Sequence, residues 1–211
     1  MTASPLYSAA DFRRRALLQN GFQVETAWAE HGDHLINPEA HDYVQALKLK
    51  DAAVLVPVVD DGDEARVILT QRTAKLKKHS GQIAFPGGGI DPEDASPEMA
   101  ALREAEEEIG LDRAHVEVVG RLPHYLSFTG FRITPVLSVV KPGFSLTLNP
   151  DEVDEVFEVP LSWLMEPSHH ERGSRPWAGA DRYYYVMPYE GRNIWGITAS
   201  IIRTIYERLY A

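Results

Sequence analysis

The chain has 211 residues, which is enough for one hydrophobic core with a few added elements. Its formal charge of −10 at pH 7 gives no overall field that attracts nucleic acid, and the absence of cysteine excludes disulfides, thiol nucleophiles and cysteine-bound zinc. No apolar run approaches the ~18 residues of a membrane span and no secretory signal opens the chain, so we expect a soluble, cytoplasmic protein with no membrane partner.

The N-terminal segment, residues 1–45, is predicted to be a helical extension packed on the main domain. Its pattern favours one peripheral helix, about residues 9–18, followed by a loop. No repeat, linker or low-complexity segment interrupts the remainder, so residues 46–211 are predicted to form one domain.

An acidic turn between two apolar runs predicts a β-hairpin at the start of that domain. Residues 52–59 and 65–70 form the two strands, and Asp60-Asp61-Gly62-Asp63 forms the turn. The loop that follows carries the basic residues Arg72, Lys75, Lys77 and Lys78.

The best-defined element is a helix over residues 97–109. Ser96 is a typical N-cap, Pro97 suits the first helical position, and Gly110 suits a left-handed C-terminal residue. Strands are predicted over residues 116–122, 133–140, 156–159 and 183–188, with an amphipathic helix near residues 197–209 at the end. These elements predict an α/β fold with a mixed sheet and flanking helices.

One face of the 97–109 helix carries three carboxylates. At about 100° per residue, Glu104, Glu107 and Glu108 fall in one arc beside the apolar stripe. Like charges at such spacing repel, and a divalent cation would remove the repulsion. A solvated acidic surface is the competing interpretation. However, Gly87-Gly88-Gly89 lies one loop before the helix and offers exposed backbone to a metal or a phosphate.

The segment 103–111 resembles the second half of the Nudix box, Arg-Glu-U-x-Glu-Glu-x-Gly-U, in which U is aliphatic. The first half departs from the pattern, because the expected glutamate position holds Ala95. Asp94 instead follows Gly88 after five intervening residues, so the loop is one residue longer and carries an aspartate.

Segments on both sides of the box resemble the coenzyme A pyrophosphatase branch of the Nudix family, over roughly residues 50–205. This resemblance implies the Nudix α/β/α sandwich over residues 46–211, dependence on Mg²⁺ or Mn²⁺, and a small nucleotide substrate. The implied reaction is hydrolysis of coenzyme A or acyl-coenzyme A to 3′,5′-ADP and (acyl-)4′-phosphopantetheine. The segments are Leu69-Thr70-x-Arg72-Thr73, Gly81-Gln82, Phe85-Pro86-Gly87-Gly88, Thr129-Gly130-Phe131 and Ile194-Trp195-Gly196.

Together, the residues and the resemblance suggest roles at the site. Arg103 precedes Glu107 by one helical turn, so it can orient that carboxylate or the loop acid Asp94. The basic loop can hold the 3′-phosphate and pyrophosphate of coenzyme A, although a solvated lysine loop is equally compatible with the sequence. The predicted metal ligands are Glu104, Glu107, Glu108 and Gly88, and the predicted substrate-binding residues are Arg72, Lys75, Lys78 and Gly87.

The general base stays open, because metal binding would make all three box glutamates poor proton acceptors. An acidic loop over residues 149–156 precedes the strand at 156–159. We predict that Glu152 or Glu155 deprotonates the attacking water, with Glu107 as the rival base.

Two alternative functions share part of this pattern. A Nudix enzyme acting on ADP-ribose or another nucleoside diphosphate derivative would use the same catalytic residues. A non-catalytic nucleotide-sensing module would be expected to lose carboxylates that are present here. Trp195 and the tyrosines at 183–185 are interpreted as core or interface residues. The sequence does not determine the oligomeric state, and it is compatible with a homodimer.

Overall fold

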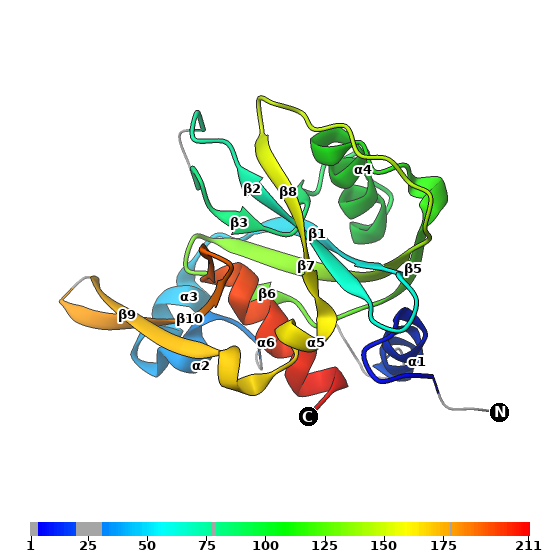
Figure 1. Ribbon diagram of the computed structural model, residues 1–211. Helices are drawn as coiled ribbons and strands as arrows, with labels where there is room; N and C mark the ends of the chain where they lie inside the picture. The colour runs from blue at the N-terminus through cyan, green and yellow to red at the C-terminus, as the bar shows by residue number, and fades with distance from the viewer. Residues whose placement is uncertain (1–3, 20–30, 77–78, 178) are drawn as a thin grey trace.

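A mixed sheet of eight strands forms the centre of the computed structural model, which describes residues 4–19, 31–76, 79–177 and 179–211 (Figure 1). Strand β1 (Lys50–Val59) pairs in parallel with β7 (Phe131–Val140) along its whole length. On its other edge it pairs antiparallel with β2 (Arg66–Arg72) and with β4 (Gly87–Gly89). The parallel pair among antiparallel ones confirms the predicted mixed sheet, and the β1–β2 hairpin is confirmed with it.

The remaining strands extend this sheet and add a second one. The strands β5 (Val116–Arg121) and β6 (Tyr125–Leu126) pair with β7, while β3 (Ile83–Ala84) and β8 (Val153–Pro160) pair with β2. The second sheet is antiparallel and three-stranded. It contains β9 (Glu171–Trp177), β10 (Ala180–Tyr189) and β11 (Arg192–Trp195), of which the sequence predicted only part of β10.

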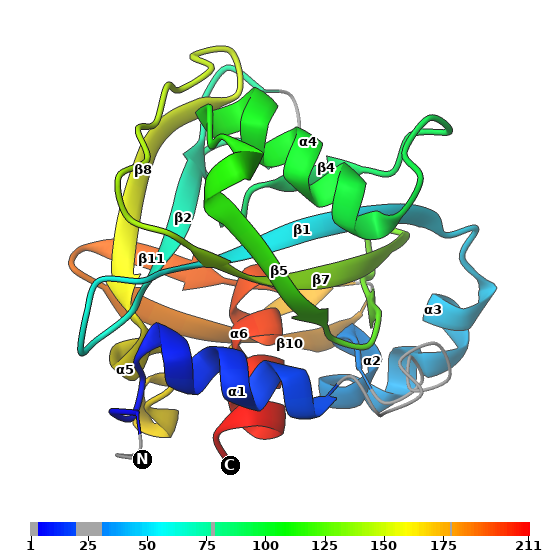
Figure 2. The same cartoon turned by 90° about the vertical axis from the view of Figure 1, so that its right-hand side faces the viewer.

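Helices cover both faces of the central sheet, as Figure 2 shows. Helix α4 (Pro97–Ile109) lies on one face, and α6 (Ile197–Leu209) lies on the other with α1 (Ala9–Gln19). Alternate residues of β1 reach the two sides: Ala53 and Leu55 pack in the cluster with α4, and Val56 and Val58 in the cluster with α1 and α6. The predicted α/β/α sandwich is therefore confirmed.

Helix α4 has the bounds that its capping residues predict. Ser96 accepts a hydrogen bond on Oγ from the backbone N–H of Met99, at 3.3 Å. Gly110 ends the helix with a left-handed φ of 66°. Ala101, Ala105 and Ile109 are buried, which leaves the acidic arc on the neighbouring face.

The region between α1 and β1 is more helical than predicted. No pattern in the sequence predicts its short helices, and residues 20–30, where a loop was predicted, lie outside the described residues. The boundary at residues 45/46 stays a prediction. No described helix combines the length and apolar character needed to cross a bilayer. The short helices are α2 (Asp33–Ile36), η2 (Pro38–Ala40) and α3 (His41–Ala46), and later in the chain η3 (Arg113–His115), α5 (Leu161–Leu164) and η4 (Pro167–His169).

Candidate active site

Glu108 is the most enclosed carboxylate of α4, with 2% of its surface exposed. Its Oε2 accepts a hydrogen bond from the backbone N–H of Gly87 at 3.1 Å, and its Oε1 accepts one from Nη1 of Arg72 at 3.1 Å. Burial raises the pKa of Glu108 to about 7, although the Gly87 hydrogen bond and the Arg72 charge oppose that rise. The helix thus holds a carboxylate at a fixed point beside the glycine run.

Glu104 lies one turn earlier, with its carboxylate against the backbone of Gly88. A side-chain carbon at residue 88 would lie 2.5 Å from the carboxylate carbon of Glu104, so any residue but glycine would displace this carboxylate. Burial raises the pKa of Glu104, and the charges of Glu107 and Glu152 add to that rise, while Arg103 opposes it. The glycine run and the acidic helix therefore meet, as their order in the sequence predicted.

Arg103 joins the loop before α4 to the acidic face of the helix. Its Nη1 lies 3.0 Å from Glu104 and 3.1 Å from Glu107, and its Nη2 lies 2.9 Å from Asp94. The same Nη2 donates to the carbonyl oxygen of Gly89 at 3.1 Å. The hydrogen bond from Arg103 lowers the pKa of Asp94. Both partners expected for Arg103 from the sequence are in contact with it.

The other predicted acids differ in how close they come to this group. Glu107 lies at the rim, with 55% of its side chain exposed. Glu152 accepts a hydrogen bond from Nδ2 of Asn149 at 3.1 Å, and its charge raises the pKa of both Glu104 and Glu108. Glu152 therefore belongs to the same cluster of carboxylates.

Glu155 lies elsewhere. Strand β8 begins at Val153, so the predicted loop is shorter than expected and Glu155 is part of the strand. Its Oε1 pairs with Nη2 of Arg192 at 2.5 Å. The placement of Glu155 in a loop is wrong because the pairing of β8 with β2 extends almost to the acidic turn.

The donor set at the end of α4 consists of oxygen atoms. Within the described ranges, no three acidic or histidine side chains lie close enough together to hold a metal ion by themselves. Carboxylates beside glycine backbone instead fit a hard divalent ion that keeps waters and substrate phosphates among its ligands.

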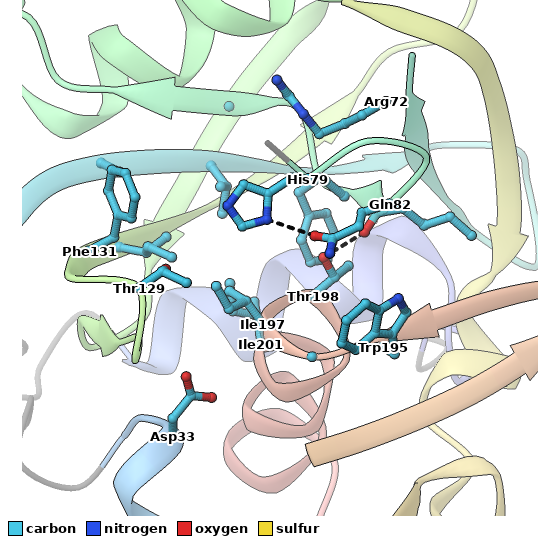
Figure 3. A pocket seen from close by; sticks show the side chains of 18 of the residues that line it. Asp33, Arg72, His79, Gln82, Thr129, Phe131, Trp195, Ile197, Thr198 and Ile201 are labelled. Atoms are coloured by element: carbon cyan, nitrogen blue, oxygen red, sulfur yellow. Dashed lines mark hydrogen bonds between the residues drawn. The ribbon is translucent and has the colours of Figure 1, made fainter. Parts of the chain in front are cut away.

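A cavity of about 340 Å³ opens beside the glycine run (Figure 3). Gly87, Gly88 and Gly89 form part of its wall together with Arg72. Figure 3 shows Arg72 and Asp33 on opposite sides of the cavity. The apolar part of the wall includes Val54, Ile83, Phe85, Phe131, Ile197 and Ile201.

The predicted substrate-binding residues are only partly gathered here. Gly87 and Arg72 line the cavity, and Arg72 also contacts Glu108. Lys75 is exposed and is not among the residues that line the cavity, so its role in substrate binding stays a prediction. Lys78, like Lys77, lies outside the described residues.

Sequence reasoning missed the part of the wall that the second sheet provides. Trp195 and Tyr184 line the cavity with their rings edge to face at 5.4 Å, and neither residue is fully buried. The interpretation of these two residues as core is therefore wrong, and their role at an interface stays a prediction. The alternation of β10 was an available signal, because it places Arg182 and Tyr184 on one face of the strand.

Comparisons with known proteins identify one family. A family model described as the NUDIX domain matches residues 49–178. A relative from Citrobacter koseri, described as an uncharacterized Nudix hydrolase NudL, is 41% identical over 171 residues, covering 81% of this chain and 88% of the relative. An Escherichia coli K12 protein of the same description is 40% identical over 161 residues, covering 76% and 83%. The crystal structure of DR0079 from Deinococcus radiodurans, 14% identical, covers 79% of this chain and 87% of that one with a TM-score of 0.50, a likeness of fold alone.

Proposed function

Because this chain belongs to the Nudix hydrolase family, we propose that it cleaves the phosphoanhydride of coenzyme A or acyl-coenzyme A to 3′,5′-ADP and (acyl-)4′-phosphopantetheine. The family makes the chain a pyrophosphohydrolase acting on small nucleotide derivatives. The coenzyme A substrate is supported by residues 69–88, whose sequence resembles that branch. It is supported also by the cavity that begins at the same glycine run.

The observation that carries this proposal is the contact between the carboxylates of α4 and the cavity wall. Glu108 accepts a hydrogen bond from the N–H of Gly87, Glu104 lies against Gly88, and the same glycine run lines the cavity. A substrate in the cavity would thus present its phosphoanhydride to the glycine run. Its apolar or aromatic parts would lie along Phe131 and Ile197.

Nudix hydrolases generally use divalent metal ions, and Mg²⁺ or Mn²⁺ would be held here by Glu104, Glu107, Glu108 and the backbone of Gly88. The ion supplies positive charge at the phosphoanhydride and favours deprotonation of the attacking water. The protein contributes the fixed geometry, because Glu108 is buried and hydrogen-bonded at both oxygens. Arg103 holds Glu104 and Glu107 in one position relative to Gly89.

For the proton of the attacking water we favour Glu152 as the acceptor. Its carboxylate is close enough to Glu104 and Glu108 to raise the pKa of both groups. Glu155, the second candidate, forms an ion pair with Arg192, which makes it a poorer proton acceptor. Glu107 is the rival base, since it is exposed at the rim and contacts Arg103.

A substrate panel tests the proposal. The protein is incubated with Mg²⁺ or Mn²⁺ and with coenzyme A, acetyl-coenzyme A, ADP-ribose or a dinucleoside polyphosphate, and products are identified by mass spectrometry. We expect 3′,5′-ADP from the coenzyme A compounds at the highest kcat/KM. If ADP-ribose is turned over at least about tenfold more efficiently while coenzyme A is inert, the coenzyme A assignment is wrong and the family assignment stands.

A further inference from the structure

Two arginines meet on the hairpin that closes the far side of the cavity. Arg175 of β9 and Arg182 of β10 are directly paired across the two strands, and both line the cavity. Like charges placed opposite each other on a sheet destabilise it. A pair of this kind on a cavity wall therefore suggests an anionic ligand between the two guanidinium groups.

Asp33 neutralises only one of these charges. Its Oδ2 lies 3.1 Å from Nη2 of Arg182 and also accepts a hydrogen bond from the N–H of Phe128 at 2.8 Å. Its Oδ1 accepts a hydrogen bond from the hydroxyl of Tyr125 at 2.6 Å. Because Asp33 is buried and bonded at both oxygens, it holds Arg182 in a fixed position over the Phe128 ring, 4.0 Å from its centroid.

Arg175 supplies the uncompensated charge. Within the described part of the chain it forms no salt bridge, and its guanidinium lies over the Trp195 ring, 5.7 Å from the centroid. Among the described residues, these two guanidinium groups and the Asp33 carboxylate sum to one net positive charge at this end. Burial lowers the pKa of Arg182. The charge of Asp33 raises this pKa, and the neighbouring charge of Arg175 lowers it.

We propose that Arg175 and Arg182 form a subsite for a phosphate monoester that the substrate carries apart from its phosphoanhydride. The planar fork of arginine matches the oxygens of a phosphate in geometry and charge. Asp33 and Arg72 lie on opposite sides of the cavity, so this subsite is separate from the glycine run (Figure 3). The proposal deepens the proposed function and rests on it, because coenzyme A carries a 3′-phosphate, whereas ADP-ribose carries no phosphate monoester.

The test measures binding of 3′,5′-ADP and of 5′-AMP by titration calorimetry in excess Mg²⁺, with the wild-type protein, R175Q and R172Q. These two ligands differ only in the 3′-phosphate. Arg172 is a matched control because it is an exposed arginine of the same strand on the opposite face, over Tyr183 rather than in the cavity. Circular dichroism checks that both variants are folded.

We expect the wild type and R172Q to bind 3′,5′-ADP about tenfold more tightly than 5′-AMP, and R175Q to bind the two ligands nearly equally. A wild type that binds both within about twofold overturns the subsite, and so does an equal loss in R172Q and R175Q.

A kinetic arm separates this proposal from the proposed function, using kcat/KM for coenzyme A and 3′-dephospho-coenzyme A. If neither compound is hydrolysed but the binding preference is present and depends on Arg175, the subsite stands and the coenzyme A activity fails. If both are hydrolysed at equal efficiency and the binding preference is absent, the activity stands and the subsite fails.

Discussion

The two ends of the cavity are built in different ways. At the helix end, Gly87 and Glu108 are 21 residues apart in sequence and come from consecutive elements. At the hairpin end, Asp33 and Arg182 are 149 residues apart and come from α2 and β10. The first end holds a dense group of carboxylates, and the second holds an excess of arginine. The difference suggests that the chemistry is concentrated in one compact motif, while substrate choice depends on parts of the chain that meet only in the fold.

Glu108→Gln should give the largest effect at the helix end. The substitution keeps the shape but removes the buried charge, so kcat should fall by about three orders of magnitude at saturating Mg²⁺. Glu106→Gln is the matched control, because Glu106 is on the same helix but pairs with Arg113. Steady-state kinetics of both variants measure the difference. Activity close to wild type in Glu108→Gln contradicts the ligand role.

The general base should show the next effect. Glu152→Gln should lower kcat by about two orders of magnitude and flatten the acidic limb of the pH profile. Glu155→Gln serves as the control on the same segment, and we expect it to keep most activity because Glu155 pairs with Arg192. If Glu107→Gln instead loses the acidic limb while both other variants keep it, Glu107 is the base.

Arg103→Lys tests how the loop is fixed to the helix. Lysine keeps the charge but cannot reach Asp94, Glu104 and Glu107 together, so kcat should fall by about tenfold with KM little changed. Arg113→Lys provides the comparison, since Arg113 contacts only the outward-facing Glu106 among the described ion pairs. If kcat and KM are the same in the two variants, Arg103 does not position the carboxylates.

Tyr184→Leu probes the hairpin end. Loss of the ring that faces Trp195 should raise KM about fivefold and leave kcat nearly unchanged, because the chemistry occurs at the other end. Tyr183→Leu changes the neighbouring residue on the opposite face and should leave both constants unaltered. If Tyr184→Leu instead lowers kcat and leaves KM unchanged, the hairpin end is not a binding region separate from the chemistry at the helix end.

The smallest expected effect is on the free energy of unfolding of the metal-free protein. The pKa of Glu108 is raised from 4.5 to about 7 in the folded protein, so the folded state binds its proton more tightly than the unfolded state. The stability from this group is present below pH 4.5 and is lost as the pH rises through about 7. In chelator, the urea midpoint should fall over this range in the wild type and fall less in Glu108→Gln. Parallel curves for the two proteins exclude this contribution.

The sequence alone determined the helix end because its signals are local. The period of an α-helix places Glu104, Glu107 and Glu108 on one side, and Ser96 and Gly110 set the ends of the helix through bonds within one turn. The order of glycine run, loop and helix then brings Gly88 against Glu104. Such contacts depend on residues close in the chain, so spacing was enough to find them.

Only the tertiary structure decided the hairpin end and the choice among distant acids. Asp33 is fixed by Tyr125, Phe128 and Arg182, and no local pattern encodes contacts across such separations. Glu155 became a strand residue because β8 pairs with β2, a long-range contact that outweighs the loop-like composition of its sequence. Trp195 lines the cavity rather than the core because β11 packs beside β3, a contact between segments far apart in the sequence. The free energy that fixes these residues comes from packing between distant segments, which residue spacing does not reveal.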